Sequence, residues 1–333
     1  MADSLENRVV VITGASSGIG RACARAFGAT GANVALIARS QPALEAAAGE
    51  ITAAGGHALS LPLDVADSDA VQKGAAAVEQ QWGHIDVWVN NAMVSVFSPA
   101  MQMNMQEFRH VTEVNYLGCV YGTMAALASM VPRDSGVVVQ VCSALAYRSI
   151  PLQSAYCASK AAMRAFSDSV RTELLHDGSK VRISTLILPA VNTPQFDVVR
   201  SRLPRHPQPV PPIYQPELIA DAVLYACRHG VREMVIGGSA LKAVVGQKIA
   251  PGLLDRYVGR TLYDAQQTDQ PINPDRPDNL FAPLPGDPGA HGDFDSKARS
   301  RSLQLWARMH PRVSAIGLLA AMALGQRLLR KPA

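Results

Sequence analysis

The chain has 333 residues, of which 48% are hydrophobic and 17% charged, so it can form a sizeable core and is not a disordered protein. Its net charge of +4 is uneven, because residues 296–333 carry eight basic side chains and no acidic one, which leaves −4 on the rest. The five cysteines show neither a CxxC pair nor metal-ligand spacing. We therefore expect no metal site and no disulfide framework, and a reducing cytoplasm as the location.

Short β-branched runs alternate along the chain with longer alanine-rich stretches. The predicted strands are 9–13, 34–38, 58–62, 87–90, 137–141, 181–188 and 234–236. The predicted helices between them are 21–29, 43–53, 69–82, 154–175 and 216–228. Strands that are apolar on both faces suit a parallel sheet covered by helices on each side. The pattern predicts an α/β fold, a doubly wound parallel sheet of Rossmann type with about seven strands, over residues 1–238.

Three further segments follow this predicted domain. Residues 239–270 keep a helical pattern and are expected to form a helical extension. Residues 271–295 contain six prolines and are expected to form an extended surface loop or linker. Residues 296–333 are expected to form a basic, apolar tail helix.

The tail contains an uncharged run of 12 residues, 313–324. At about 1.5 Å per residue this run spans roughly 18 Å, too little for a hydrocarbon core of about 30 Å. Basic and apolar side chains before it are typical of helices at a membrane interface. Two hypotheses stay open: peripheral attachment to an anionic inner membrane face, or docking on the chain's own domain or a sister subunit. Nucleic acid is not an expected partner, since no reading module is recognisable.

Three glycines lie between the first predicted strand and the helix after it. In the run Val9 to Gly20, Gly14 can form a tight turn, Gly18 allows a pyrophosphate to approach the backbone, and Gly20 lets the helix pack on the strand. The helix N-terminus, with its free N–H groups, favours an anion at this point. Strand, turn and helix together predict a dinucleotide site.

The spacing Thr-Gly-x-x-x-Gly-Ile-Gly resembles the short-chain dehydrogenase/reductase family, and later motifs extend the likeness over residues 8–238. The resemblance implies that Asp64 holds the adenine ring and that Asn91 and Ala92 lie beside the cofactor. Two departures are Met93 and Ala190, where the family usually has glycine. The cofactor-binding residues implied are Thr13, Gly14, Ser16, Ser17, Gly18, Ile19, Gly20, Asp64, Val65, Asn91, Ala92, Tyr156, Lys160, Pro189 and Thr193.

The end of the second predicted strand indicates which dinucleotide is bound. An acidic residue there would bind the ribose hydroxyls and repel a 2′-phosphate, which favours NAD. This chain has Ala38 followed by Arg39. A guanidinium matches a phosphate in charge and in forked hydrogen-bond geometry, so Arg39 favours NADP. The alternative is a solvated surface arginine.

A second set of residues suggests the chemistry. Tyr156 and Lys160, at positions i and i+4, share one face of a helix, and an adjacent ammonium favours the phenolate. With Ser143 and Asn115, this pair matches the catalytic group of the family. The resemblance implies that Tyr156 is the general acid/base, that Ser143 polarises the substrate oxygen, that Lys160 also binds the ribose, and that Asn115 fixes a water connecting Lys160 to solvent.

These motifs predict an oxidoreductase that transfers a hydride between NADP(H) and a carbonyl or secondary alcohol. Residues 195–215 correspond to the family's substrate lid, where Phe196, Val198, Val199, Leu203 and Ile213 either line an apolar pocket or pack within the loop. We expect a largely apolar ketone or alcohol as substrate, and a homo-oligomer. The alternative is a non-catalytic Rossmann protein that senses the cofactor or scaffolds partners.

Overall fold

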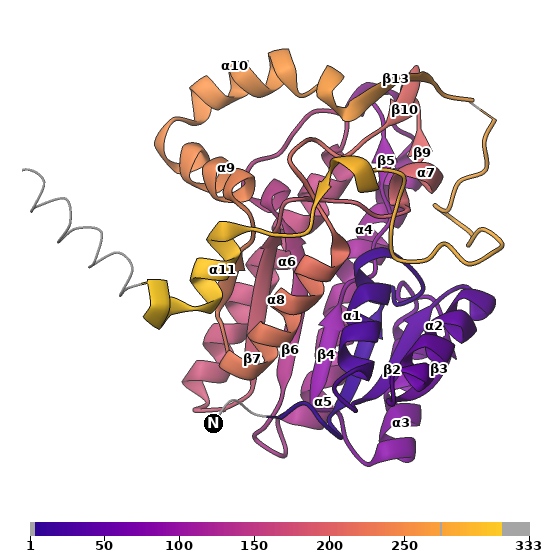
Figure 1. The fold of residues 1–333 in the computed structure, drawn as a ribbon, viewed down its shortest axis with the longest axis vertical. Coiled ribbons are helices and arrows are strands. Elements are labelled where there is room, and N and C mark those ends of the chain that lie inside the picture. Colours follow the sequence, from indigo (N-terminus) through magenta and orange to yellow (C-terminus); the bar gives the residue numbers. More distant parts are fainter. Residues whose placement is uncertain (1–3, 274, 315–333) are drawn as a thin grey trace, which may run out of the picture.

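The computed structural model describes residues 4–273 and 275–314, and its centre is a seven-stranded sheet (Figure 1). All strand pairs in this sheet are parallel, in the order β12-β7-β6-β4-β1-β2-β3. The strands are β1 Val9–Thr13, β2 Asn33–Ala38, β3 His57–Pro62, β4 Val87–Asn90, β6 Val137–Ser143, β7 Arg182–Leu188 and β12 Glu233–Val235. The predicted doubly wound Rossmann-type sheet is confirmed.

Helices cover both faces of the sheet. One face packs against α1 Gly18–Gly28, α2 Gln41–Ala53 and α8 Pro216–His229, and the other against α3 Ser68–Trp82, α5 Gly118–Met130 and α6 Ser154–His176. Within β1, Val10 and Ile12 join the first of these clusters, and Val9 and Val11 join the second. Successive side chains of a strand point to opposite faces, so a strand buried on both sides must be apolar throughout.

The strand order reverses at β1. Strand β1 pairs with β2 on one side and with β4 on the other. The later strands are therefore added outward from β1 in both directions. The connections after β1 and β4 therefore diverge and leave a crevice at the carboxyl ends of these strands, where doubly wound sheets bind ligands.

A wide turn interrupts the path between α4 Met105–Thr112 and α5. Residues Glu113–Leu117 form a π-helical segment, η2, in which Val114 and Asn115 are buried. A π-helical turn holds an extra residue compared with an α-helical one, and such turns often occur at functional sites. The turn directs Asn115 inward, and the side chain of Asn115 is fully buried.

Short elements surround the crevice. Three small sheets pair β5 Val96–Phe97 with β9 Arg200–Ser201, β10 Arg205–Pro207 with β13 Gln267–Pro271, and β11 Ile213–Tyr214 with both β8 Ala190–Val191 and β14 Ala298–Arg299. The remaining elements are α7 Gln195–Val198, α9 Gly238–Ile249, α10 Pro251–Thr261, α11 Leu303–Met309 and the 3₁₀ turns η1 Ala100–Gln102, η3 Ala144–Ala146, η4 Asp264–Gln266 and η5 Asp295–Lys297. Strands β13 and β14 thus attach the later part of the chain to loops of the main sheet.

Residues 239–270 contain α9 and α10, as the helical pattern predicts. Among its described residues, 271–273 and 275–295, the proline-rich stretch after them has no helix before η5, but parts of it are buried. Leu280 is fully buried, and Ala290 and Phe294 are also buried. In Figure 1 this segment crosses the molecule above α1 on its way to α11. Proline content predicts the absence of regular structure and does not predict what the backbone contacts.

Only the beginning of the predicted tail helix lies within the described residues. Leu305 of α11 is buried, and Met309 packs against the cluster that contains α8, whereas Leu303 and Trp306 are exposed. The apolar run 313–324 lies outside the described residues except for its first two positions. In the part of the chain that is described, no helix is both long and apolar enough to cross a membrane.

Replacing Trp88 tests how strongly the sheet centre contributes to stability. Trp88 of β4 is fully buried, and its Nε1 donates to Asn90 Oδ1 at 2.8 Å. The Trp88→Ala variant should lose roughly 3–5 kcal/mol of unfolding free energy, because it leaves a large cavity. Trp306→Ala is the control, since the half-exposed Trp306 should contribute about 1 kcal/mol or less. Urea unfolding measures both, and equal losses would contradict this view of the core.

Candidate active site

A cavity of about 980 Å³ opens at the carboxyl ends of the parallel strands. Its floor includes Gly14 after β1, Asn91 after β4, Ser143 at the end of β6 and Pro189 after β7. Ligand pockets usually measure roughly 300–1,000 Å³. This cavity is therefore large enough for a ligand of dinucleotide size.

The loop from β1 to α1 approaches its neighbours closely. A Cβ atom on Gly20 would lie 2.1 Å from Gly14 O and 2.6 Å from Asn91 Nδ2. Gly14 and Gly18 also have φ angles of +66° and +55°, which side chains other than glycine rarely adopt. Helix α1 begins at Gly18, its Ser17 N-cap makes no side-chain hydrogen bond, and its first turn has no acidic residue. The N-terminus of α1 can therefore attract an anion through the helix dipole and the backbone N–H groups of its first turn.

Thr13 and Asn91 connect this loop to β4. Thr13 Oγ1 accepts hydrogen bonds from the backbone N–H groups of Asn91 and Ala92 at 3.0 and 3.1 Å. Asn91 Nδ2 donates in return to Thr13 O and Gly14 O at 3.0 and 3.1 Å. Thr13 and Gly20 lie behind the cavity wall, whereas the other cofactor residues expected from the sequence all line the cavity.

Ser143, Tyr156 and Lys160 come together in this cavity. Ser143 Oγ accepts from Leu145 N at 3.1 Å, which fixes the hydroxyl at the end of β6. Tyr156 is half-buried in the first turn of α6. Lys160 is 2% exposed; its Nζ donates to Val141 O at 2.8 Å and lies 5.8 Å from the centroid of the Tyr156 ring.

Burial dominates the acid–base properties of this group. It raises the pKa of Tyr156 well above the ordinary value; Cys142 adds to that shift, and a hydrogen bond with Ser143 opposes it. Burial also lowers the pKa of Lys160. The sequence leads us to expect a phenol whose pKa is lowered by the adjacent ammonium, whereas burial shifts the pKa of Tyr156 in the opposite direction.

Asn115 lies outside the cavity wall. Its Oδ1 accepts from Val94 N at 2.8 Å, and its Nδ2 donates to Val94 O at 3.0 Å and to Ser159 Oγ at 3.2 Å. Asn115 thus joins the segment after β4 to the helix that carries Tyr156 and Lys160. The water-fixing role implied by the resemblance stays a prediction.

Arg39 and Asp64 line the end of the cavity at β2 and β3. The guanidinium of Arg39 donates to Asn279 O at 2.6 Å and to Leu280 O at 3.1 Å. Burial lowers the pKa of Arg39, and the charge of Asp64 opposes this shift. Arg39 is thus not the solvated surface arginine that the sequence left open, because the later part of the chain holds it in the wall.

Sequence reasoning missed a large part of the wall. Residues of α9, α10 and the segment following β13 also line the cavity: Ser239, Ala240, Lys242, Ala243, Leu254, Tyr257, Val258, Asn279, Pro283, Leu284, Pro285, Gly286, Asp287, Pro288, His291 and Asp293. Of the lid residues considered above, Phe196 and Val198 line the cavity, whereas Val199, Leu203 and Ile213 are buried and do not. No local motif marks the residues from α9 onward.

A sheet of this topology with a glycine loop at its switch point defines the class of Rossmann-type dinucleotide-binding proteins. A family model described as short chain dehydrogenase matches residues 8–203. The uncharacterized oxidoreductase YxnA of Bacillus subtilis (strain 168) is 34% identical over 330 residues, which cover 97% of this chain and 92% of that protein. The chain belongs to the short-chain dehydrogenase/reductase family, as its motifs predict.

Solved structures of this family support the assignment. A metagenomic short-chain oxidoreductase in complex with NADP is 30% identical, with a TM-score of 0.60, over 70% of this chain and 98% of that chain. An alcohol dehydrogenase from the archaeon Thermococcus sibiricus complexed with 5-hydroxy-NADP is 31% identical, with a TM-score of 0.60, over 69% of this chain and 95% of that chain.

Substituting Gly20 tests the close packing of the loop. In Gly20→Ala the new methyl group must displace Gly14 O, so we expect dinucleotide affinity to fall at least about tenfold and stability to fall by roughly 1–3 kcal/mol. Gly49→Ala is the matched control, because a Cβ at this position in α2 meets no atom within 4 Å. Fluorescence titration and urea unfolding measure both variants. Unchanged affinity in Gly20→Ala would contradict the packing argument.

Proposed function

We propose that the protein transfers a hydride between NADP(H) and the carbonyl or secondary alcohol group of a largely apolar substrate. The observation that carries the proposal is that Ser143, Tyr156 and Lys160 line the same cavity as the glycine loop. A dinucleotide suits this cavity, since Gly14 and Gly18 of the glycine loop line it and helix α1 begins there with no acidic residue in its first turn. The two solved relatives described above hold NADP or its 5-hydroxy derivative.

A nicotinamide held in this cavity would supply or accept the hydride at its C4 carbon. In reduction, the substrate carbon gains the hydride and the carbonyl oxygen gains the phenolic proton of Tyr156. A hydrogen bond from Ser143 stabilises negative charge on that oxygen and is stronger in the transition state than in the ground state. Burial favours the protonated phenol, which suits this direction, because a general acid must hold its proton when the reaction begins.

Lys160 and Asn115 support the phenol in different ways. The ammonium of Lys160 is anchored on Val141 O within the cavity and would bind the nicotinamide ribose. The positive charge of Lys160 also stabilises the phenolate left after proton transfer. Asn115 positions α6 through Ser159, so it acts on the site through the helix that carries the reacting side chains.

Apolar side chains in the cavity wall support the proposed substrate class. Phe196 and Val198 of α7 and Leu254 and Val258 of α10 line the cavity. Such a lining favours a substrate that can leave water at little cost. The helical extension would then form part of the substrate pocket. Assembly into a homo-oligomer and peripheral attachment to an anionic membrane stay predictions from the sequence.

Removing the phenolic hydroxyl tests the chemistry. With NADPH and a panel of apolar ketones, Tyr156→Phe should lose about 10²–10⁴-fold in kcat, the usual contribution of a general acid, while NADPH still binds. Tyr225→Phe on α8 is the control, because Tyr225 does not line the cavity. NADPH oxidation followed by absorbance measures turnover. Wild-type protein that binds NADPH but turns over no ketone would favour a cofactor sensor instead.

Reversing the charge at position 39 tests coenzyme preference. Arg39→Asp should lower the ratio of kcat/KM for NADPH to that for NADH by roughly 10–100-fold, since a carboxylate repels the 2′-phosphate. Arg109→Asp is the control, because it makes the same change of charge at an exposed side chain of α4 that pairs with Glu113. This variant should leave the ratio unchanged. Steady-state kinetics with both coenzymes give the ratio. The same ratio in Arg39→Asp and wild type would exclude Arg39 from coenzyme recognition.

A further inference from the structure

Residues 279–295, called the strap below, pass the glycine loop, where Gly289 O accepts a hydrogen bond from Gly18 N. The strap lies beyond the family model, which ends at residue 203. Asn279, Asp287 and His291 are among the strap residues that line the cavity. The strap is therefore a wall of the same space that the dinucleotide would occupy.

The strap reaches the adenosine end of the cavity through Arg39. The carbonyls of Asn279 and Leu280 accept both hydrogen bonds of the Arg39 guanidinium. Leu280 O also accepts a hydrogen bond from His110 Nε2 at 2.9 Å, and the Leu280 side chain is fully buried. This end of the strap is thus firmly anchored, and it fixes the direction in which Arg39 points.

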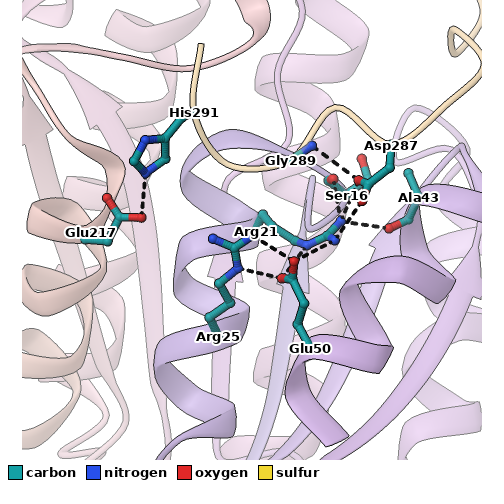
Figure 2. Close-up of polar contacts among 9 residues, drawn as sticks. All are labelled: Ser16, Arg21, Arg25, Ala43, Glu50, Glu217, Asp287, Gly289 and His291. Atoms are coloured by element: carbon teal, nitrogen blue, oxygen red, sulfur yellow. Dashed lines mark hydrogen bonds and ion pairs between the residues drawn. The ribbon is translucent and has the colours of Figure 1, made fainter. Parts of the chain in front are cut away.

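The middle of the strap contacts the phosphate end. Gly18 N donates to Gly289 O at 3.0 Å. Asp287 accepts two hydrogen bonds from Arg21, at 3.1 and 3.2 Å (Figure 2). A paired guanidinium and carboxylate in this forked arrangement form one of the stronger polar contacts available to a protein.

Arg21 and Asp287 differ in burial and in the number of their other partners. Arg21 is 1% exposed and also donates to Ser16 O, Ala43 O and Glu50, so it stays in place without Asp287. The side chain of Asp287 is 46% exposed and, in the described residues, its only ion pair is with Arg21. Opening of the strap would therefore release Asp287 and leave the helix intact.

The last part of the strap reaches the nicotinamide end. A Cβ atom on Gly292 would lie 2.4 Å from Thr193 O, and Phe294 N donates to Asn192 Oδ1 at 3.1 Å. His291 bridges two carboxylates, Glu217 of α8 at 2.8 Å and Asp295 at 2.7 Å; Figure 2 shows the bond to Glu217. The strap is thus fastened along the whole length of the groove.

We propose that the strap belongs to the cofactor site and encloses the dinucleotide against the glycine loop, so that release of NADP(H) requires the Asp287–Arg21 contact to open. The inference rests on the proposed function, since it takes a nicotinamide dinucleotide as the ligand. It goes further in assigning a binding role to a segment outside the matched family region.

Dissociation of the coenzyme tests the strap directly. NADPH bound to the full chain is displaced by excess NADP⁺ in a stopped-flow instrument, and nicotinamide fluorescence reports the rate. In Asp287→Asn, which removes one charge and keeps the size of the side chain, dissociation should accelerate about five- to tenfold. NADH should also dissociate faster from Asp287→Asn than from the wild type, by a similar factor. The substitution leaves the contacts of Arg39 unchanged, because they lie at the other, anchored end of the strap.

Asp269→Asn is the matched control. It removes the same charge from a fully exposed side chain on β13, 3.9 Å from Arg205, and should leave the dissociation rate unchanged. A rate in Asp287→Asn within about twofold of the wild-type rate overturns the proposal. The measurement needs no turnover, so a chain that binds NADPH but reduces no ketone refutes the catalytic proposal and still tests the strap.

Amide hydrogen exchange on the wild-type chain gives a second measurement that does not depend on a variant. Saturation with NADPH should slow exchange over residues 279–295, because a bound dinucleotide would favour the closed strap. Equal exchange with and without NADPH, under conditions where NADPH is bound, overturns the proposal. A wild-type chain that binds neither NADPH nor NADH overturns both this inference and the proposed function.

Discussion

A buried guanidinium joins the segments that form the phosphate end of the cavity. Arg21 contacts the glycine loop through Ser16 O, α2 through Ala43 O and Glu50, and the strap through Asp287. Transferring an unpaired charge out of water would be very costly, so a guanidinium that is 1% exposed must keep its partners. This requirement fixes the spacing of the three segments around the crevice at β1 and β4.

The site combines two parts of the chain with different functions. The parallel sheet places the glycine loop, Ser143 and the helix bearing Tyr156 and Lys160 at one edge, because the carboxyl ends of parallel strands meet there. Helix α10 and the strap supply further walls of the same cavity. The chemistry would depend on the first part, and retention of the coenzyme and the apolar character of the pocket would depend on the second.

The sequence alone could predict the features that rest on local spacing. The glycines between β1 and α1 and the i, i+4 pair of Tyr156 and Lys160 belong to single turns, so their positions follow from secondary structure. The strap could not be predicted in this way, because Gly292 matters only through its approach to Thr193. The pKa of Tyr156 could not be predicted either, since burial, which sequence spacing does not report, outweighs the neighbouring polar groups.

The late position of the strap has a consequence for biosynthesis. A ribosome makes the strands of the sheet before it makes the strap, and folding generally proceeds from the N-terminal side during translation. A nascent chain can therefore assemble its sheet and its reacting side chains while the groove is still open on one side. Coenzyme that enters at this stage would meet no barrier and would be enclosed as the final segments leave the exit tunnel. The first loading of the protein would then differ kinetically from every later exchange.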